Sequence, residues 1–348
     1  MSWMIYGANG YTGELLAREA VRRGQRPVLG GRSHGAVTRL AAELGLEARV
    51  FALEDADLAT PMAGVTLVLH CAGPFSATAA TMIRACLAAQ AHYLDITGEV
   101  SVFEHAQAQN AAAQAAGIVV CTGVGFDVVP TDCVARALSE ALPSATHLAL
   151  GFDGRSSWSR GTARTMVEGL GQGGCVRERG VLRRVRLGYR DRRIDFGAGE
   201  KLAMTIPWGD VSTAFHTTGI PNIEVYVPMS PARLRALRRL NLVRWLLGLG
   251  FVQRRLKAKV DRQPPGPDDA ERATTPTHVW GEARDAAGRT VTARIETANG
   301  YTVTVQAALG VVERLLARPA EPGATTPARL MGARYVESLP GSGPIRIS

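Results

Sequence analysis

Three glycines, each separated by two residues, stand between a short apolar run and a helical pattern near the start of the chain. They are Gly7, Gly10 and Gly13, and the run is 4–6. The first glycine lets the backbone turn sharply, the second lets N–H groups approach an anion, and the third lets a helix pack against the strand. The helix expected over 12–23 directs its positive end at that anion. The order predicts a dinucleotide pyrophosphate site; the alternative is a turn that only connects two elements.

A basic residue follows the second predicted strand, where dinucleotide sites hold the adenosine ribose. NAD binders usually carry a carboxylate there, whereas this chain has an arginine. A guanidinium binds a 2′-phosphate that a carboxylate would repel, which predicts NADP(H) over NAD; the alternative is a solvated surface arginine. The cofactor-binding residues expected here are Gly7, Asn9, Gly10, Tyr11, Thr12, Gly13, Gly31, Arg32 and Ser33.

The elements that must position these residues repeat as strand and helix through the first third of the chain. The run 65–71 is apolar throughout, which is typical of a parallel strand buried on both faces. The repeat predicts a Rossmann-type doubly wound parallel sheet. We expect this dinucleotide-binding domain over 1–132, completed by 303–348. The strands are expected at 4–6, 26–30, 49–53, 65–71, 92–96 and 118–122.

The pattern changes after residue 133, where strand-like segments follow one another without regular helices between them. This predicts a second α+β domain over 133–302, built on a mainly antiparallel sheet, which would supply the wall of the substrate site. Its strands are expected at 147–153, 183–189, 222–228, 277–283 and 290–297.

Ligands of doubly wound sheets bind beyond the carboxyl ends of the strands. That rule selects the segments 71–75, 95–99 and 123–132. Gly73-Pro74 would let the backbone lie beside the nicotinamide, or would simply make a tight turn. The cofactor-binding residues expected in these segments are Ala72, Gly73, Pro74, Phe75, Thr97, Gly98, Glu99 and Phe126.

Composition excludes several classes of function. The 348 residues carry a net charge of +9, but no basic stripe is interleaved with aromatic residues, which argues against a nucleic-acid partner. The five cysteines show no C-x-x-C spacing, so we expect neither a disulfide framework nor a metal site. The first strand starts too near residue 1 for a signal peptide, which favours a cytoplasmic protein.

One apolar stretch, 240–252, lies between arginine-rich flanks. It is too short to span a bilayer, which takes about 20 apolar residues. The stretch suits a peripheral contact with an anionic membrane, the wall of an acyl pocket, an oligomer contact, or a buried helix whose arginines reach the surface.

Together these motifs resemble the saccharopine dehydrogenase-like oxidoreductases, in particular the bacterial branch of trans-acting enoyl reductases. The resemblance is carried by the segments 7–13, 30–33, 72–75, 93–99 and 125–132, and by later short matches as far as Gly300-Tyr301. It implies an NAD(P)-binding Rossmann domain and a second domain that contributes to substrate binding and often to a homodimer. A full set of the polar groups with which saccharopine reductases hold amino-acid carboxylates is not found here, which favours a less polar substrate.

A reductase needs a proton donor near the hydride acceptor, and a buried carboxyl group with a raised pKa can supply that proton. Asp127 is the first candidate, although it is equally placed to cap the helix after Pro130. His216 is the second, in a stretch, 207–221, that we expect to be a loop able to close over the cofactor; it also fits a hydrogen-bonded loop histidine. Glu99 also fits a helix cap. The expected substrate residues are Asp95, Arg160, Thr162 and Trp208.

Three functions compete at this point. The first is NADPH-dependent reduction of an apolar small-molecule or acyl-carrier-bound substrate, at an enoyl C=C bond. The second is reduction of an imine, as in saccharopine chemistry. The third is a non-catalytic, cofactor-binding, lipid-associated protein.

Overall fold

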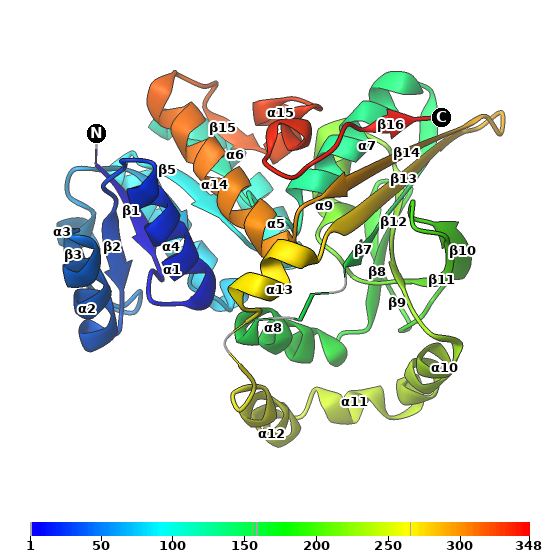
Figure 1. Cartoon of the computed structure of the whole chain (residues 1–348), viewed down its shortest axis with the longest axis horizontal. Helices are drawn as coiled ribbons and strands as arrows, with labels where there is room; N and C mark the ends of the chain where they lie inside the picture. The colour runs from blue at the N-terminus through cyan, green and yellow to red at the C-terminus, as the bar shows by residue number, and fades with distance from the viewer. Residues whose placement is uncertain (1, 155, 158, 265) are drawn as a thin grey trace. The chain divides into compact units, whose positions relative to one another are not determined.

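The computed structural model describes residues 2–154, 156–157, 159–264 and 266–348 (Figure 1). These residues form two units. Unit 1 comprises Met1–Asp127 and Val303–Leu330, and unit 2 comprises Val128–Thr302 and Met331–Ser348.

Unit 1 is built on a sheet of seven strands in the order β15-β6-β5-β4-β1-β2-β3, with every neighbouring pair parallel. Consecutive strands are separated by helices, because parallel neighbours need crossover connections. The predicted Rossmann-type sheet is therefore confirmed. Its strands are β1 (Ser2–Tyr6), β2 (Val28–Gly31), β3 (Ala48–Val50), β4 (Val65–His70), β5 (His92–Asp95), β6 (Val119–Cys121) and β15 (Gly323–Thr325).

Helices lie on both faces of this sheet. On one face, α1 and α14 are joined by polar side chains: Arg23 binds Glu313 at 2.9 Å, and Gln306 donates to Glu19 at 3.2 Å. On the other face, Met82 and Ile83 of α4 lie in the buried core. The helices are α1 (Tyr11–Arg22), α2 (His34–Leu44), α3 (Ala59–Met62), α4 (Phe75–Ala89), α5 (Val100–Ala108), α6 (Asn110–Ala116) and α14 (Gly300–Ala317).

Unit 2 is built on a nine-stranded sheet in which all pairs are antiparallel except β12 with β7, so the predicted mainly antiparallel sheet is also confirmed. The strands are β7 (Ala145–Gly154), β8 (Gly174–Glu178), β9 (Val181–Val185), β10 (Asp191–Asp195), β11 (Glu200–Thr205), β12 (Asn222–Pro228), β13 (Thr277–Asp285), β14 (Thr290–Thr297) and β16 (Arg346–Ile347).

One face of this sheet is apolar and packs on α7 (Val129–Ala141). The packing is close at Gly281 of β13, where a β-carbon would lie 2.6 Å from Val134 and 2.7 Å from Leu138. Two hydroxyl-to-carboxylate bonds then join α7 to α9 (Asp210–Thr218). Thr131 donates to Asp210 at 2.6 Å, and Thr217 donates to Asp132, so two buried aspartates fix these helices together.

The apolar stretch 240–252 lies in a row of short helices along one edge of unit 2 (Figure 1). Leu242, Val243, Trp245 and Phe251 are exposed, so the interpretation as a buried helix is wrong for these four. No helix among the described residues is both long and apolar enough to cross a membrane. The row consists of α10 (Pro231–Leu240), η1 (Asn241–Val243), α11 (Arg244–Leu247) and α12 (Gly250–Val260).

Two sequence expectations differ from the structure. The first domain was expected to include the whole of 303–348, but 331–348 lies in unit 2, because β16 pairs with β14 there. The stretch 207–221 was expected to be a loop, but it contains the nine-residue helix α9. Its β-branched and small polar residues are weak helix formers, and packing against α7 and β12 overrides that weak preference.

Candidate functional site

The glycine turn of unit 1 leaves no room for side chains. Gly7 has a φ of +84°, in the left-handed region, and a β-carbon there would lie 2.7 Å from the backbone nitrogen of Ala72. A β-carbon on Gly13 would lie 2.3 Å from the carbonyl oxygen of Gly7. The turn is held by hydrogen bonds from the N–H groups of Gly7 and Ala8 to the carbonyl of Gly30, at 2.8 and 3.2 Å. β1 and α1 can therefore meet at this angle only through glycine.

Helix α1 begins directly after this turn, with Gly10 as its N-cap and with no side chain capping it. The N–H groups of a first helical turn have no partner within the helix, so an uncapped start binds anions. Gly10 is exposed, and Tyr11 and Thr12 are half-buried in that first turn. The arrangement fits the pyrophosphate of a dinucleotide.

The end of β2 lies beside this turn. A β-carbon on Gly31 would lie 3.1 Å from the side-chain oxygen of Asn9. Arg32 and Ser33 follow, both exposed, and Ser33 is the N-cap of α2 without making a side-chain bond to that helix. An exposed guanidinium beside a helix start suits a phosphate group. This edge therefore has room and charge for an anionic group of a dinucleotide.

The segment after β4 is held by a partly buried chain of polar groups. The Thr78 hydroxyl donates to the carbonyl of Ala72 at 2.7 Å, and Nε2 of His70 lies 2.9 Å from the same hydroxyl. Gly73 and Pro74 follow, and Pro74 is the N-cap of α4. The predicted tight strand-to-helix turn is thus present, beside the glycine turn that Ala72 contacts.

His70 itself was not selected from the sequence. Its ring is fully buried among the rings of Tyr6, Phe75 and Tyr93, and burial lowers its pKa to about 3, so it is neutral. Its Nδ1 has no hydrogen-bond partner among the described residues. Its place at the carboxyl end of a buried strand was the signal that could have identified it.

Asp95, at the end of β5, is fully buried and joins two strand ends. One carboxylate oxygen accepts the N–H groups of Thr97 and Gly123 at 3.1 and 2.8 Å, and the other accepts the Tyr93 hydroxyl at 2.8 Å. Burial raises its pKa to about 7, although these hydrogen bonds oppose the shift. The geometry makes Asp95 a positioning residue for the loops that follow β5 and β6.

Glu99 caps a helix, but not the helix that follows it. Its two carboxylate oxygens accept the N–H groups of Phe75 and Ser76, each at 2.9 Å, at the start of α4. The N–H of Glu99 in turn donates to the hydroxyl of Thr97 at 3.1 Å. The charge therefore satisfies the positive end of α4 and joins the segments after β4 and β5.

Asp127 lies against the segment after β5. A β-carbon on Gly98 would lie 2.8 Å from the carboxylate of Asp127, so only a glycine leaves space for that group. Burial raises the pKa of Asp127 to about 7. The neighbouring Phe126 donates its N–H to the hydroxyl of Thr304 in α14 at 3.0 Å. The structure thus brings a carboxyl group that is partly protonated at neutral pH to the carboxyl edge of the sheet.

The candidate substrate residues in unit 2 lie in two places. Arg160 and Thr162 are in the first turn of α8 (Arg160–Leu170), which Ser159 caps through the N–H of Thr162. The hydroxyl of Tyr301 accepts the N–H of Ser159 at 2.6 Å. Trp208 instead packs against Phe152 of β7, with 4.9 Å between ring centroids and an angle of 51° between the ring planes.

His216 lies in the last turn of α9, half-buried, with its ring 5.5 Å from that of Phe215. It is held in a helix rather than in a mobile closing loop. Asp210 and Thr217 in the same helix are bonded to α7, so His216 belongs to the body of unit 2.

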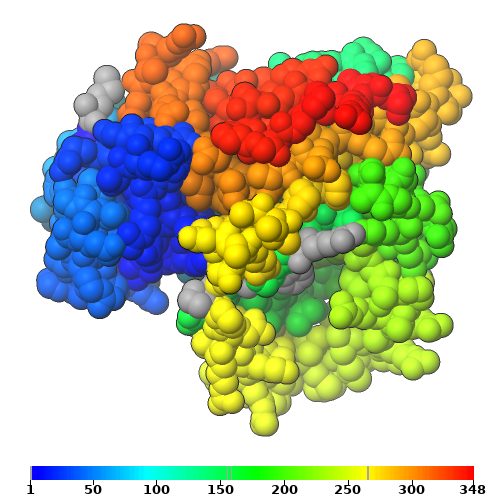
Figure 2. All heavy atoms as spheres, in the orientation of Figure 1, coloured from blue at the N-terminus to red at the C-terminus, as the bar shows by residue number. Residues whose placement is uncertain are grey.

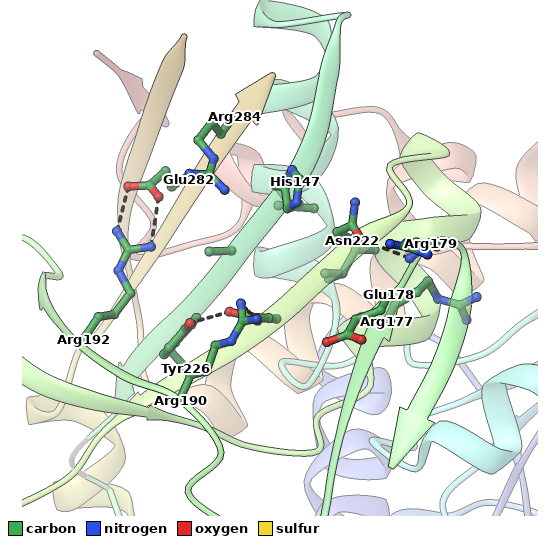
Figure 3. A pocket seen from close by; sticks show the side chains of 14 residues that line it. His147, Arg177, Glu178, Arg179, Arg190, Arg192, Asn222, Tyr226, Glu282 and Arg284 are labelled. Carbon is green, nitrogen blue, oxygen red and sulfur yellow. Dashed lines mark hydrogen bonds and ion pairs between the residues drawn. The ribbon is translucent and has the colours of Figure 1, made fainter. Parts of the chain in front are cut away.

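A polar cavity of about 410 Å³ lies over the sheet of unit 2 (Figure 3). Much of its charge is internally paired: Arg192 binds both oxygens of Glu282 at 2.9 and 2.8 Å, and Arg190 binds Glu224 at 2.6 Å. Burial, with the charge of nearby Arg284, lowers the pKa of His147 in the lining. This cavity suits a polar ligand, and its described lining does not include the candidate residues Arg160, Thr162, Trp208 and His216.

The geometry agrees with comparisons with known proteins. Residues 3–121 match the family described as "Saccharopine dehydrogenase NADP binding domain". These residues resemble the NADP-binding domain of saccharopine dehydrogenases, as the sequence predicts, and unit 1 therefore carries a nicotinamide dinucleotide-binding domain.

Saccharopine dehydrogenase-like relatives match over part of the chain. A trans-acting enoyl reductase of Mycobacterium tuberculosis is 31% identical over 37% of this chain and 33% of its own length. A saccharopine dehydrogenase-like oxidoreductase of Arabidopsis thaliana is 28% identical over 50% of this chain and 44% of its own length. The chain thus spans less than half the length of these relatives.

A likeness in fold to a solved structure extends over the whole chain. The apo form of saccharopine dehydrogenase (L-Glu forming) from Saccharomyces cerevisiae superposes with a TM-score of 0.65 and 11% identity, covering 100% of this chain and 99% of that one. At this identity the likeness concerns the fold.

Glu99→Ala should destabilise unit 1, because two N–H groups at the start of α4 lose a charged acceptor. The expected loss is about 1–2 kcal/mol of unfolding free energy, measured by urea denaturation. Glu321→Ala, an exposed glutamate of the same unit, is the control and should change nothing. Equal stability of the two variants would refute the cap.

Proposed function

We propose that this saccharopine dehydrogenase-like protein is an NADPH-dependent reductase that delivers a hydride to an apolar, acyl-type substrate at an enoyl C=C bond. The observation that carries the proposal is the edge of unit 1, where an uncapped helix start and an exposed arginine stand side by side. NADPH supplies the hydride when it is bound. The chain's own residues bind and orient the cofactor and supply the proton.

The glycine turn binds and orients the cofactor. The first turn of α1 would hold the pyrophosphate, and Arg32 with Ser33 would hold the 2′-phosphate. The polar contacts of Asp95 and Glu99 keep the loops after β4, β5 and β6 in fixed positions beside that turn. Such pre-organisation lowers the entropy that the site loses on binding.

Asp127 is the proposed proton donor. Its raised pKa leaves part of the carboxyl group protonated at neutral pH, and a carboxylic acid in that range transfers a proton efficiently. We further propose that unit 2 contacts the substrate through His216, Arg160, Thr162 and Trp208, and that the protein works as a homodimer. The enoyl assignment is supported by the name of the mycobacterial relatives, and we propose that an acyl carrier bears the substrate.

Arg32→Ala should remove the preference for NADPH, because a charge-assisted bond to the 2′-phosphate is lost while the pyrophosphate site is intact. We expect NADPH affinity to fall roughly 10- to 100-fold and NADH affinity to stay within about twofold. Fluorescence titration with both cofactors measures this. Equal NADPH and NADH affinity in the wild type would overturn the NADP assignment.

Asp127→Asn should lower kcat by at least about tenfold, or roughly 1.4 kcal/mol, with NADPH affinity unchanged. Because the donor is the protonated form, the wild-type rate should fall as pH rises above about 7, and this limb should vanish in the variant. NADPH oxidation is followed with a medium-chain enoyl thioester as substrate.

The same assay compares the two chemistries. NADPH oxidation with a mixture of an amine and a 2-oxo acid, and none with the enoyl thioester, would replace the enoyl proposal by imine reduction. NADPH binding without oxidation of either substrate would favour the non-catalytic alternative. A flat pH profile in the wild type would exclude Asp127 as the donor.

A further inference from the structure

Exposed apolar side chains are concentrated in one short segment of unit 2. Among the described residues, seven large apolar side chains are exposed, and four of them lie within ten residues, 242–251. They include Leu242 at 83%, Trp245 at 68% and Phe251 at 62% exposure. Scattered exposed apolar residues are ordinary, whereas such a cluster marks an interaction surface.

The residues around this apolar cluster are strongly basic. The thirty residues 231–260, called the segment from here on, contain nine arginines and lysines and no aspartate or glutamate. Six of these cations are exposed and make no ion pair with any described residue. They are Arg233, Arg235, Arg239, Arg254, Arg255 and Lys259.

Polar bonds on the inner side hold the segment in place at both ends. Asn241 accepts the N–H of Leu187 at 2.9 Å and donates to the carbonyl of the same residue at 3.1 Å. Gln253 donates to the carbonyl of Val167 at 2.9 Å, and Lys257 pairs with Glu168 of α8. The exposed apolar residues between these anchors are therefore presented by a fixed backbone rather than by a frayed end.

We propose that the segment 231–260 is a peripheral membrane-binding surface for anionic lipids. Trp245 and Phe251 would enter the interface between headgroups and acyl chains, while the arginines bind headgroup phosphates. Charge complementarity selects this occupant. A second copy of the chain would place these unpaired cations against one another, which is unfavourable for a symmetric contact.

The surface lies along one edge of unit 2, and its helices are drawn in yellow-green and yellow (Figure 2). Binding there needs neither the cofactor nor Asp127, so the proposal stands apart from the reductase activity. It would bring the enzyme to a source of apolar substrates.

Vesicle flotation of the full-length chain without cofactor tests the proposal. The chain should float with vesicles of phosphatidylcholine and phosphatidylglycerol in equal parts, should not float with phosphatidylcholine alone, and should be released by high salt. Fluorescence of Trp245 should shift to the blue on binding. No flotation with the anionic vesicles would overturn the proposal.

Two double variants with matched controls locate the surface. Trp245→Ser with Phe251→Ser, and Arg254→Glu with Arg255→Glu, should each lower the vesicle partition coefficient at least about tenfold. Val181→Ser alters a valine that is 68% exposed elsewhere in unit 2, and Arg84→Glu with Arg184→Glu makes the same change in net charge. These controls should bind as the wild type does.

Melting temperature and NADPH affinity of each variant show that the chain is folded. Wild-type flotation by both segment variants would overturn the proposal, as would equal losses in the controls. Light scattering without vesicles tests whether a second copy of the chain binds to this surface instead of lipid. A dimer that dissociates in the Trp245→Ser, Phe251→Ser variant would show that the segment is a contact between two copies instead.

Discussion

The structure of unit 1 depends on one steric constraint, the close contact of backbone with backbone where β1 passes into α1. A side chain at residue 13 would collide with the carbonyl of Gly7, and one at residue 7 would collide with Ala72 after β4. Because Gly7 and Gly13 have no side chains, the first helix can pack this close to the sheet. Gly10, the N-cap of this helix, has no side chain that could cap it, so the helix start suits an anion.

Two carboxylates hold this edge together. The buried Asp95 accepts N–H groups from the loops after β5 and β6, and the half-buried Glu99 accepts those at the start of α4, so the segments after β4, β5 and β6 are bonded to one another where the cofactor is expected. Asp127 has a different environment. Its carboxyl group is packed against Gly98, and desolvation raises its pKa. One edge therefore holds both positioning carboxylates and a group able to exchange a proton.

Local patterns predicted most of the fold, because the repeat of strands and helices and the glycine turn are each encoded in consecutive residues. The NADP site at Arg32 was inferred in the same way and stays a prediction. Long-range partners were not predictable in this way. Glu99 was expected to contact the cofactor or to cap a helix, yet only the tertiary structure shows that it caps α4, and the buried ring of His70 went unnoticed. The helix α9 was missed because packing overrides its weak propensity. Periodicity could not decide whether 240–252 is buried or exposed, because a buried helix and an exposed amphipathic helix have the same residue pattern.

We propose that the glycine turn and Arg32 form an NADP site, and a crystal structure of the chain with NADPH would test this. We expect the pyrophosphate at the N–H groups of the first turn of α1, with the 2′-phosphate bound by Arg32 and Ser33. A pyrophosphate bound away from residues 7–13, or a 2′-phosphate in solvent with Arg32 turned away, would contradict it.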